Sequence, residues 1–134
     1  MLASVETVIR DCHDATEHDR MTFPQILAAL HAAGVEGYWV DFRRATKTYY
    51  LPDGDSLELA FPPLDVAVAS DFDAAVVKSA IHEAQTQAPG YTYRGFSRKT
   101  MAAGCAGYIT SILGRRVVYF GRTGDTHVEH FPGQ

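Results

Sequence analysis

The sequence matches itself when it is shifted by 70 residues, and this repeat constrains the fold more than any other feature. Positions 22–64 align with positions 92–134 without a gap and share eleven identities. Unrelated sequences of ordinary composition would share about three. Several of the identities fall on turn residues and glycines, among them Gly34 with Gly104. We therefore predict that one folding unit was duplicated in this chain.

Each copy has the same predicted order of elements, which is helix–helix–strand–strand–strand. In the first copy, Thr22 is the expected N-cap of the second helix, with Pro24 in its first turn. In the second copy, Ser70 and Asp73 are spaced like a capping box at the start of the first helix. Apolar and polar residues alternate along the segments that follow, as at residues 38–43, and this period of two predicts strands.

These elements predict a single α+β domain over residues 1–134, with copy one at about 1–64 and copy two at about 71–134. Its antiparallel sheet or sheets should pack against helices with a pseudo-twofold relation. We expect the two three-stranded units either to cover each other's apolar faces or to pair edge to edge. In both cases the junction between the copies is the expected place for a groove.

The composition is that of a globular protein, with 46% apolar and 21% charged residues. A net charge of −4 gives no electrostatic reason to approach nucleic acid or anionic lipid. No apolar run approaches the ~20 residues that span a bilayer, and the N-terminus does not resemble a secretory signal. Cys12 and Cys105 are expected to be reduced and buried. We therefore predict a cytoplasmic protein that does not enter a membrane.

The last predicted strand breaks the internal symmetry. His127 and Glu129 occupy the positions that Leu57 and Leu59 fill in the first copy. Two titratable groups on a face that is apolar in the other copy are expected if one copy has become a functional site. An edge strand with one solvent-exposed face would also accommodate them. The candidate ligand-binding residues are His127, Glu129, Arg122, Tyr49 and Tyr119.

A helical stretch near the N-terminus carries histidine and carboxylate residues four apart, His13 with Glu17 and Asp14 with His18. Such pairs can bind a divalent ion, but a zinc site needs three or four converging ligands and no further set stands out. A polar helix surface explains these residues better. We therefore predict no metal site and no cofactor.

Arginine and lysine also cluster beside tyrosines, a combination that can hold phosphate and stack bases. A nucleic-acid-binding protein would need one contiguous basic face. The acidic net charge makes this the weakest of the hypotheses. The residues that would have to form such a face are Arg43, Arg44, Lys47 and Arg116.

Three stretches together resemble the YdfO-like family of small bacterial and prophage-encoded proteins. They are Val40 to Gly54, Met101 to Tyr108, and Gly121 to Pro132 with its His127-Val128-Glu129-His130 run. The resemblance covers nearly the whole chain. It implies an α+β domain of about this length, sometimes called a phage envelope protein, with no established activity. It supplies no catalytic residues.

The leading hypothesis is a non-catalytic binding module that takes a small ligand or a protein partner in the groove between the copies. One alternative is a small enzyme or metal-dependent hydrolase that uses His127 and Glu129. The other is the nucleic-acid-binding accessory protein described above. Whether the chain is an enzyme stays open. The edges that a duplicated sheet exposes also allow a homodimer.

Overall fold

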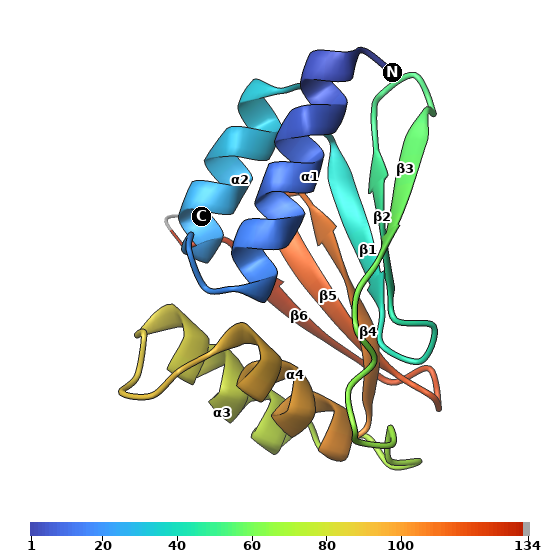
Figure 1. The fold of residues 1–134 in the computed structure, drawn as a ribbon. Coiled ribbons are helices and arrows are strands. Elements are labelled where there is room, and N and C mark those ends of the chain that lie inside the picture. The colour runs from blue at the N-terminus through green and yellow to red at the C-terminus, as the bar shows by residue number, and fades with distance from the viewer. Residues whose placement is uncertain (133–134) are drawn as a thin grey trace.

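The computed structural model describes residues 1–132, which form four helices and one six-stranded antiparallel sheet. The α+β prediction is therefore confirmed; residues 133–134 of the second copy lie outside the described residues. Figure 1 shows two helix pairs, α1 with α2 and α3 with α4, on the same face of the sheet. The elements are α1 (Ala3–Glu17), α2 (Phe23–Ala32), β1 (Gly37–Asp41), β2 (Thr46–Tyr50), β3 (Ser56–Ala60), α3 (Ala74–Gln85), α4 (Tyr93–Ala102), β4 (Cys105–Ser111), β5 (Arg116–Gly121) and β6 (Thr126–His130).

The two halves join edge to edge, which is one of the two arrangements expected from the sequence. The strand order is β3-β2-β1-β4-β5-β6, so β1 and β4 form the junction. At its centre Trp39 pairs with Ile109, which lies 70 positions further along the chain. On either side, Tyr38 pairs with Thr110 and Val40 pairs with Tyr108. A twofold axis through the Trp39–Ile109 pair therefore relates equivalent positions; the common origin of the halves stays a prediction.

Equivalent turns in the two halves also have the same backbone conformation. Gly34 and Gly104 end α2 and α4 with φ of 90° and 93°. The β1–β2 and β4–β5 turns each contain a left-handed residue that is not a glycine, Ala45 and Arg115, both with φ of 55°. The left-handed helix ends follow from the glycines, since only glycine enters this region without a steric cost.

The start of α2 agrees with the sequence prediction, whereas the start of α3 differs from it. Thr22 caps α2 through a capping box with Gln25. The predicted capping box of Ser70 and Asp73 is wrong, because Asp73 is itself the N-cap of α3 and accepts from the Val76 N–H at 3.2 Å. The helix therefore begins at Ala74, directly after Asp73, whose backbone is extended.

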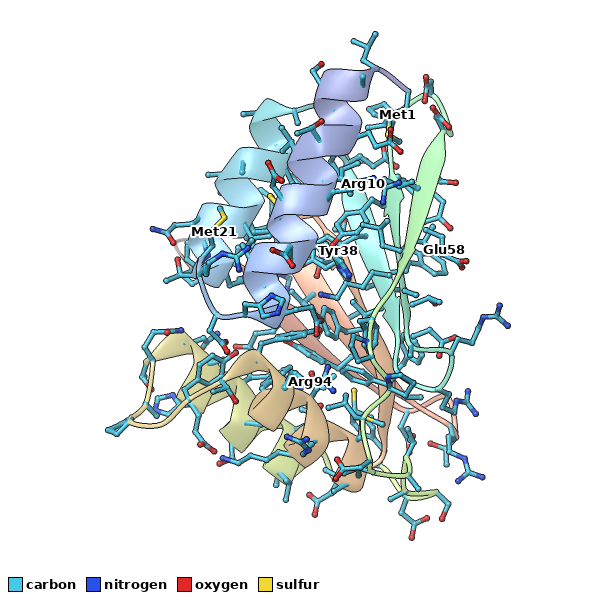
Figure 2. All side chains as sticks on the ribbon, in the orientation of Figure 1. Met1, Arg10, Met21, Tyr38, Glu58 and Arg94 are labelled. Carbon is cyan, nitrogen blue, oxygen red and sulfur yellow. The ribbon has the colours of Figure 1, made fainter. Side chains whose placement is uncertain are left out.

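The core lies between the sheet and the helices, and alternate strand residues point into it. Tyr38 lies behind α1, between the helix layer and the sheet (Figure 2). Four tyrosines form a row across the strands on this side and are buried, namely Tyr49, Tyr38, Tyr108 and Tyr119. Within residues 1–132 no helix lies on the opposite side, which we call the open face of the sheet.

Candidate functional site

The predicted residues on the last strand do come together. β6 is an edge strand, and His127 and Glu129 lie on its helix-facing side, both partly buried. The His127 Nε2 atom lies 2.8 Å from a Glu129 carboxylate oxygen. The imidazole stacks on the Tyr119 ring with centroids 6.4 Å apart, and Gln85 of α3 donates to Glu129 at 3.4 Å. Three of the five candidate residues are thus neighbours.

Arg122 and Tyr49 lie apart from that group. Arg122 follows β5 and donates to the backbone carbonyl of Val68 at 3.2 Å, which fastens the connector between the halves. Tyr49 is on β2, three strands away from β5 in the sheet order, and it packs against Tyr38 in the first half. Their predicted role beside His127 therefore has no support from the arrangement of the described side chains.

A charged cluster that sequence reasoning missed is buried where the two helix pairs meet. Lys47 of β2 points into the core with only 1% of its side chain exposed, and its Nζ lies 3.5 Å from Glu17 Oε1. Glu17, the last residue of α1, is 7% exposed and also binds Arg94 of α4 at 3.1 Å (Figure 2 shows Arg94). The ammonium lies 4.6 Å from the centre of the Tyr93 ring. Two cations therefore share one carboxylate.

The pKa values in this cluster reflect its burial. Loss of solvent lowers the pKa of Lys47 to about 8, and the attraction of Glu17 offsets only part of that effect. Burial, together with the nearby Lys47 charge, also lowers the pKa of His13, whose Nε2 lies 3.2 Å from the Ala60 carbonyl oxygen. Close by, Asp19 accepts the backbone N–H of Tyr93 at 2.8 Å. This cluster therefore ties the two halves together.

The repeat itself contained the signal for this cluster. Lys47 is equivalent to Val117, so a charge stands where the other half has an apolar core residue. Lys47 is also two residues from Tyr49 and therefore points to the same, core-facing side of β2. Lys47, like His127 and Glu129, is a polar residue at a position where the other half has an apolar one, although lysine side chains are usually exposed to solvent.

The predicted basic face does not form. Lys47 is buried on the helix side of the sheet, Arg43 and Arg44 lie in the β1–β2 turn, and Arg116 points from β5 toward the open face. These four residues therefore do not present one contiguous surface. The nucleic-acid-binding hypothesis loses the feature on which it depended.

The open face has a large apolar area at the junction between the halves. Trp39 is 54% exposed there and its ring packs edge-on against Tyr50 at 6.0 Å between centroids. A depression of about 250 Å³ surrounds them and is bounded by Glu36 and Ser111. Every second strand residue in phase with Trp39 points to this face. Its large apolar side chains are Trp39, Tyr50, Ile109, Val118, Phe120 and Val128.

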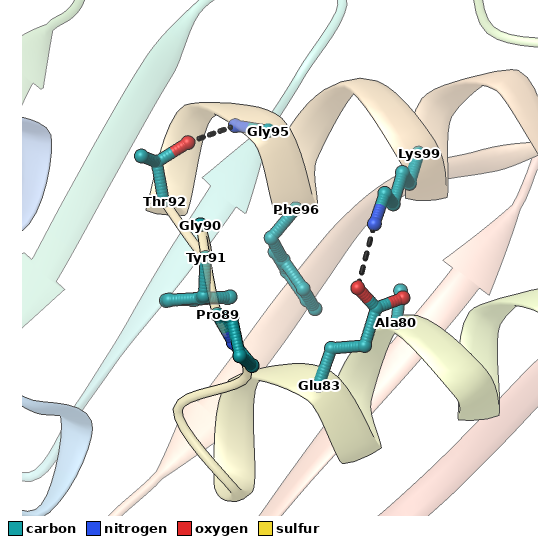
Figure 3. Close-up of a pocket in the computed structure, with 9 residues that line it drawn as sticks. All are labelled: Ala80, Glu83, Pro89, Gly90, Tyr91, Thr92, Gly95, Phe96 and Lys99. Carbon is teal, nitrogen blue, oxygen red and sulfur yellow. Dashed lines mark hydrogen bonds and ion pairs between the residues drawn. The ribbon is translucent and has the colours of Figure 1, made fainter.

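A second depression, of about 110 Å³, lies between α3 and α4 (Figure 3). Glu83 and Lys99 form a 2.7 Å ion pair along its wall, and the Thr92 hydroxyl caps the Gly95 N–H. The charges at its wall already neutralise each other, and the space is well below that of ordinary ligand pockets. This depression is therefore a gap between packed helices.

The comparisons with known proteins identify a family for most of the chain. A family described as "Protein of unknown function (DUF1398)" matches residues 15–129. The chain belongs to this family. The matched region spans both halves, from the end of α1 to β6, so the DUF1398 domain includes the buried cluster, the open face and the β6 pair. None of the curated proteins compared with the chain matches it.

The DUF1398 description gives no activity, and the YdfO-like name and prophage link stay predictions.

In residues 1–132 no three His, Cys, Asp or Glu side chains are grouped so that they could hold a metal ion. Within the same residues no helix has the length and apolar character needed to cross a membrane. The His13–Glu17 pair of α1 belongs instead to the cluster around Lys47.

Proposed function

We propose that this DUF1398 protein is a binding module that docks a protein surface on its open face, at the junction of its two halves. The proposal rests on one observation. Trp39, more than half exposed, stands at the centre of a sheet face whose second half is largely apolar and that no helix in the described part of the chain covers. Soluble proteins seldom leave large contiguous apolar patches exposed unless these bind something. Tryptophan and tyrosine are also the residues that most often dominate binding energy at interfaces.

The shape of the open face favours a protein partner over a small ligand. The depression around Trp39 holds about 250 Å³, less than the roughly 300–1,000 Å³ of pockets that enclose drug-sized ligands. The apolar area continues beyond it through Ile109 and Val118 to Val128, which is 40% exposed on the edge strand. A surface that spans several strands matches the extended contacts of protein interfaces.

Photo-crosslinking tests this function. A photoreactive amino acid replaces Val128 on the open face, and a matched protein carries it at Val76, a 44%-exposed valine on α3. Both are irradiated in an extract of the source cells. We expect discrete covalent adducts from position 128 and none of the same mass from position 76. Equal or absent adducts at the two positions would contradict the proposal.

The alternative of an enzyme at β6 has less support. A histidine oriented by a carboxylate, as in the 2.8 Å contact of His127 with Glu129, is the arrangement that general bases use. A general base also needs a reacting group within reach, and the described neighbours are the Tyr119 ring and the Gln85 amide. This pair therefore fits a satisfied edge-strand contact better than a reaction centre.

A further inference from the structure

We propose that the protein surface that docks on the open face is a second copy of this chain. Two sheets would stack face to face in a twofold sandwich, with Trp39 of each copy buried between them. This inference rests on the proposed function and names its partner. It is carried by the size of the open face, by the way charge is distributed over its two halves, and by the position of Trp39.

The open face is large enough for a stable dimer. About three residues from each of six strands point to it. With strands about 4.8 Å apart and alternate residues about 6.7 Å apart, the face covers roughly 600 Å² in projection. The accessible surface of protruding side chains exceeds this projection. It is therefore comparable with the roughly 800 Å² per partner that a standard interface buries.

The two halves of the open face differ in chemistry, and the difference is complementary. In the first half Glu58 and Asp41 are acidic, and they accompany threonines on β2. In the second half Arg116 and His130 supply the polar groups beside an apolar centre of valines and an isoleucine. A copy that places its first half over the second half of its partner sets Glu58 opposite the partner's Val128, next to the partner's His130 and diagonal to the partner's Arg116, at two equivalent places. Asp41 then faces the partner's Gly107.

A twofold axis parallel to the strands produces that arrangement. It places β1 over the partner's β4, β2 over the partner's β5, and β3 over the partner's β6, because it reverses the strand order of the facing sheet. Trp39 then lies over the partner's Ile109, which is the same residue that pairs with Trp39 within one sheet. Sheets that pack face to face in this aligned manner are about 10 Å apart, a gap that interdigitating side chains fill.

The position of Trp39 makes the dimer directly observable. It is the only tryptophan in the chain, so its fluorescence reports on the open face alone. We expect the purified full chain to sediment as a dimer at high concentration and to dissociate on dilution. As the dimer forms, the emission of Trp39 should shift to shorter wavelength and its quenching by acrylamide should fall. A monomer at every concentration would overturn the inference. A dimer whose Trp39 remains quenchable would overturn it too, because the copies would then pair through strand edges.

Matched substitutions locate the interface. Val128→Glu places a negative charge on the open face, opposite the partner's Glu58, whereas Val76→Glu makes the same change at a similarly exposed site on the helix layer. We expect Val128→Glu to weaken the dimer at least about tenfold, which corresponds to 1.4 kcal/mol or more, and Val76→Glu to leave it unchanged. Circular dichroism of both variants checks that they remain folded. Equal effects at the two positions would contradict docking on the open face.

A charge exchange tests the orientation. Glu58→Arg and Arg116→Glu each place like charges at neighbouring diagonal positions across a homodimer, once in each half, so each variant alone should dimerise more weakly than the parent. When the two variants are mixed, every such contact again joins opposite charges, and a mixed dimer should form. Failure of the mixture to associate better than either variant alone would overturn the proposed orientation.

The photoreactive Val128 protein separates this inference from the proposed function. If the second copy is the partner, irradiation of the purified protein gives an adduct of twice the chain mass of 14.7 kDa. If the purified protein remains a monomer but forms adducts of another mass in the cell extract, the inference fails and the binding function stands. If neither experiment gives an adduct, both fail.

Discussion

Replacement of Lys47 by methionine should remove a pH dependence that the buried ammonium imposes on folding. Burial lowers the pKa of Lys47 from 10.5 to about 8 in the folded chain, whereas the unfolded chain keeps the ordinary value. Between these two pH values the unfolded chain binds more protons. The folding stability from this group is therefore fully present above pH 10.5 and is lost as the pH falls toward 8. From pH 7 to pH 10 the gain is roughly 2–3 kcal/mol.

Urea unfolding followed by circular dichroism at pH 7, 8, 9 and 10 measures this gain. The unfolded tyrosines begin to ionise near pH 10 while burial raises the pKa of core residues such as Tyr108, but this effect is common to both proteins. The difference in free energy of unfolding between parent and Lys47→Met should therefore change by roughly 2–3 kcal/mol across the range. Exposed Lys78 provides the control, and Lys78→Met should run parallel to the parent. A Lys47→Met profile that also runs parallel would refute the reasoning.

Three further predictions concern the same structure. Glu17→Gln leaves Lys47 and Arg94 without their shared carboxylate. It should therefore lower the free energy of unfolding by about 3–5 kcal/mol at pH 7 and by less at pH 10, and urea unfolding at both pH values measures the difference. Gly104→Ala should lower the free energy of unfolding more than Gly34→Ala, because both glycines have positive φ but only at Gly104 would the new methyl group meet the backbone carbonyl of Asp71. Gly34→Ala should lower it by about 1–2 kcal/mol, as paired melting curves would show. His127→Ala should change the free energy of unfolding by less than about 1 kcal/mol, since its contact with Glu129 lies on a partly solvated edge strand; a much larger loss in a thermal melt would indicate a tightly coupled site at β6.

Local signals in the sequence were sufficient for most of the fold. The Thr22 cap and the paired glycines Gly34 and Gly104 have direct structural counterparts, because each depends on the chemistry of one or a few residues. The start of α3 was predicted too early, since Ser70 and Asp73 have the spacing of a capping box but only Asp73 caps the helix. Spacing alone does not fix which of two capping residues the chain uses.

The candidate sites were harder to predict because they depend on how the halves join. Edge pairing of β1 with β4 leaves a whole sheet face without helices, and this placed Trp39 on the open face. Packing of the halves against each other would have buried the same residue. The buried cluster joins Lys47, Glu17 and Arg94, which lie in three different elements, β2, α1 and α4. No local pattern brings such residues together.

Hydroxyl-radical footprinting of the protein in its own cell extract tests the docking role of the open face most directly. Oxidation rates of Trp39, Tyr50 and Phe120 report on that face, and Tyr91 between α3 and α4 serves as the reference. We predict that the three open-face residues are protected in the extract relative to dilute purified protein, while Tyr91 reacts equally in both. Oxidation of Trp39 at the same rate in both samples would contradict the claim that this face is a docking surface.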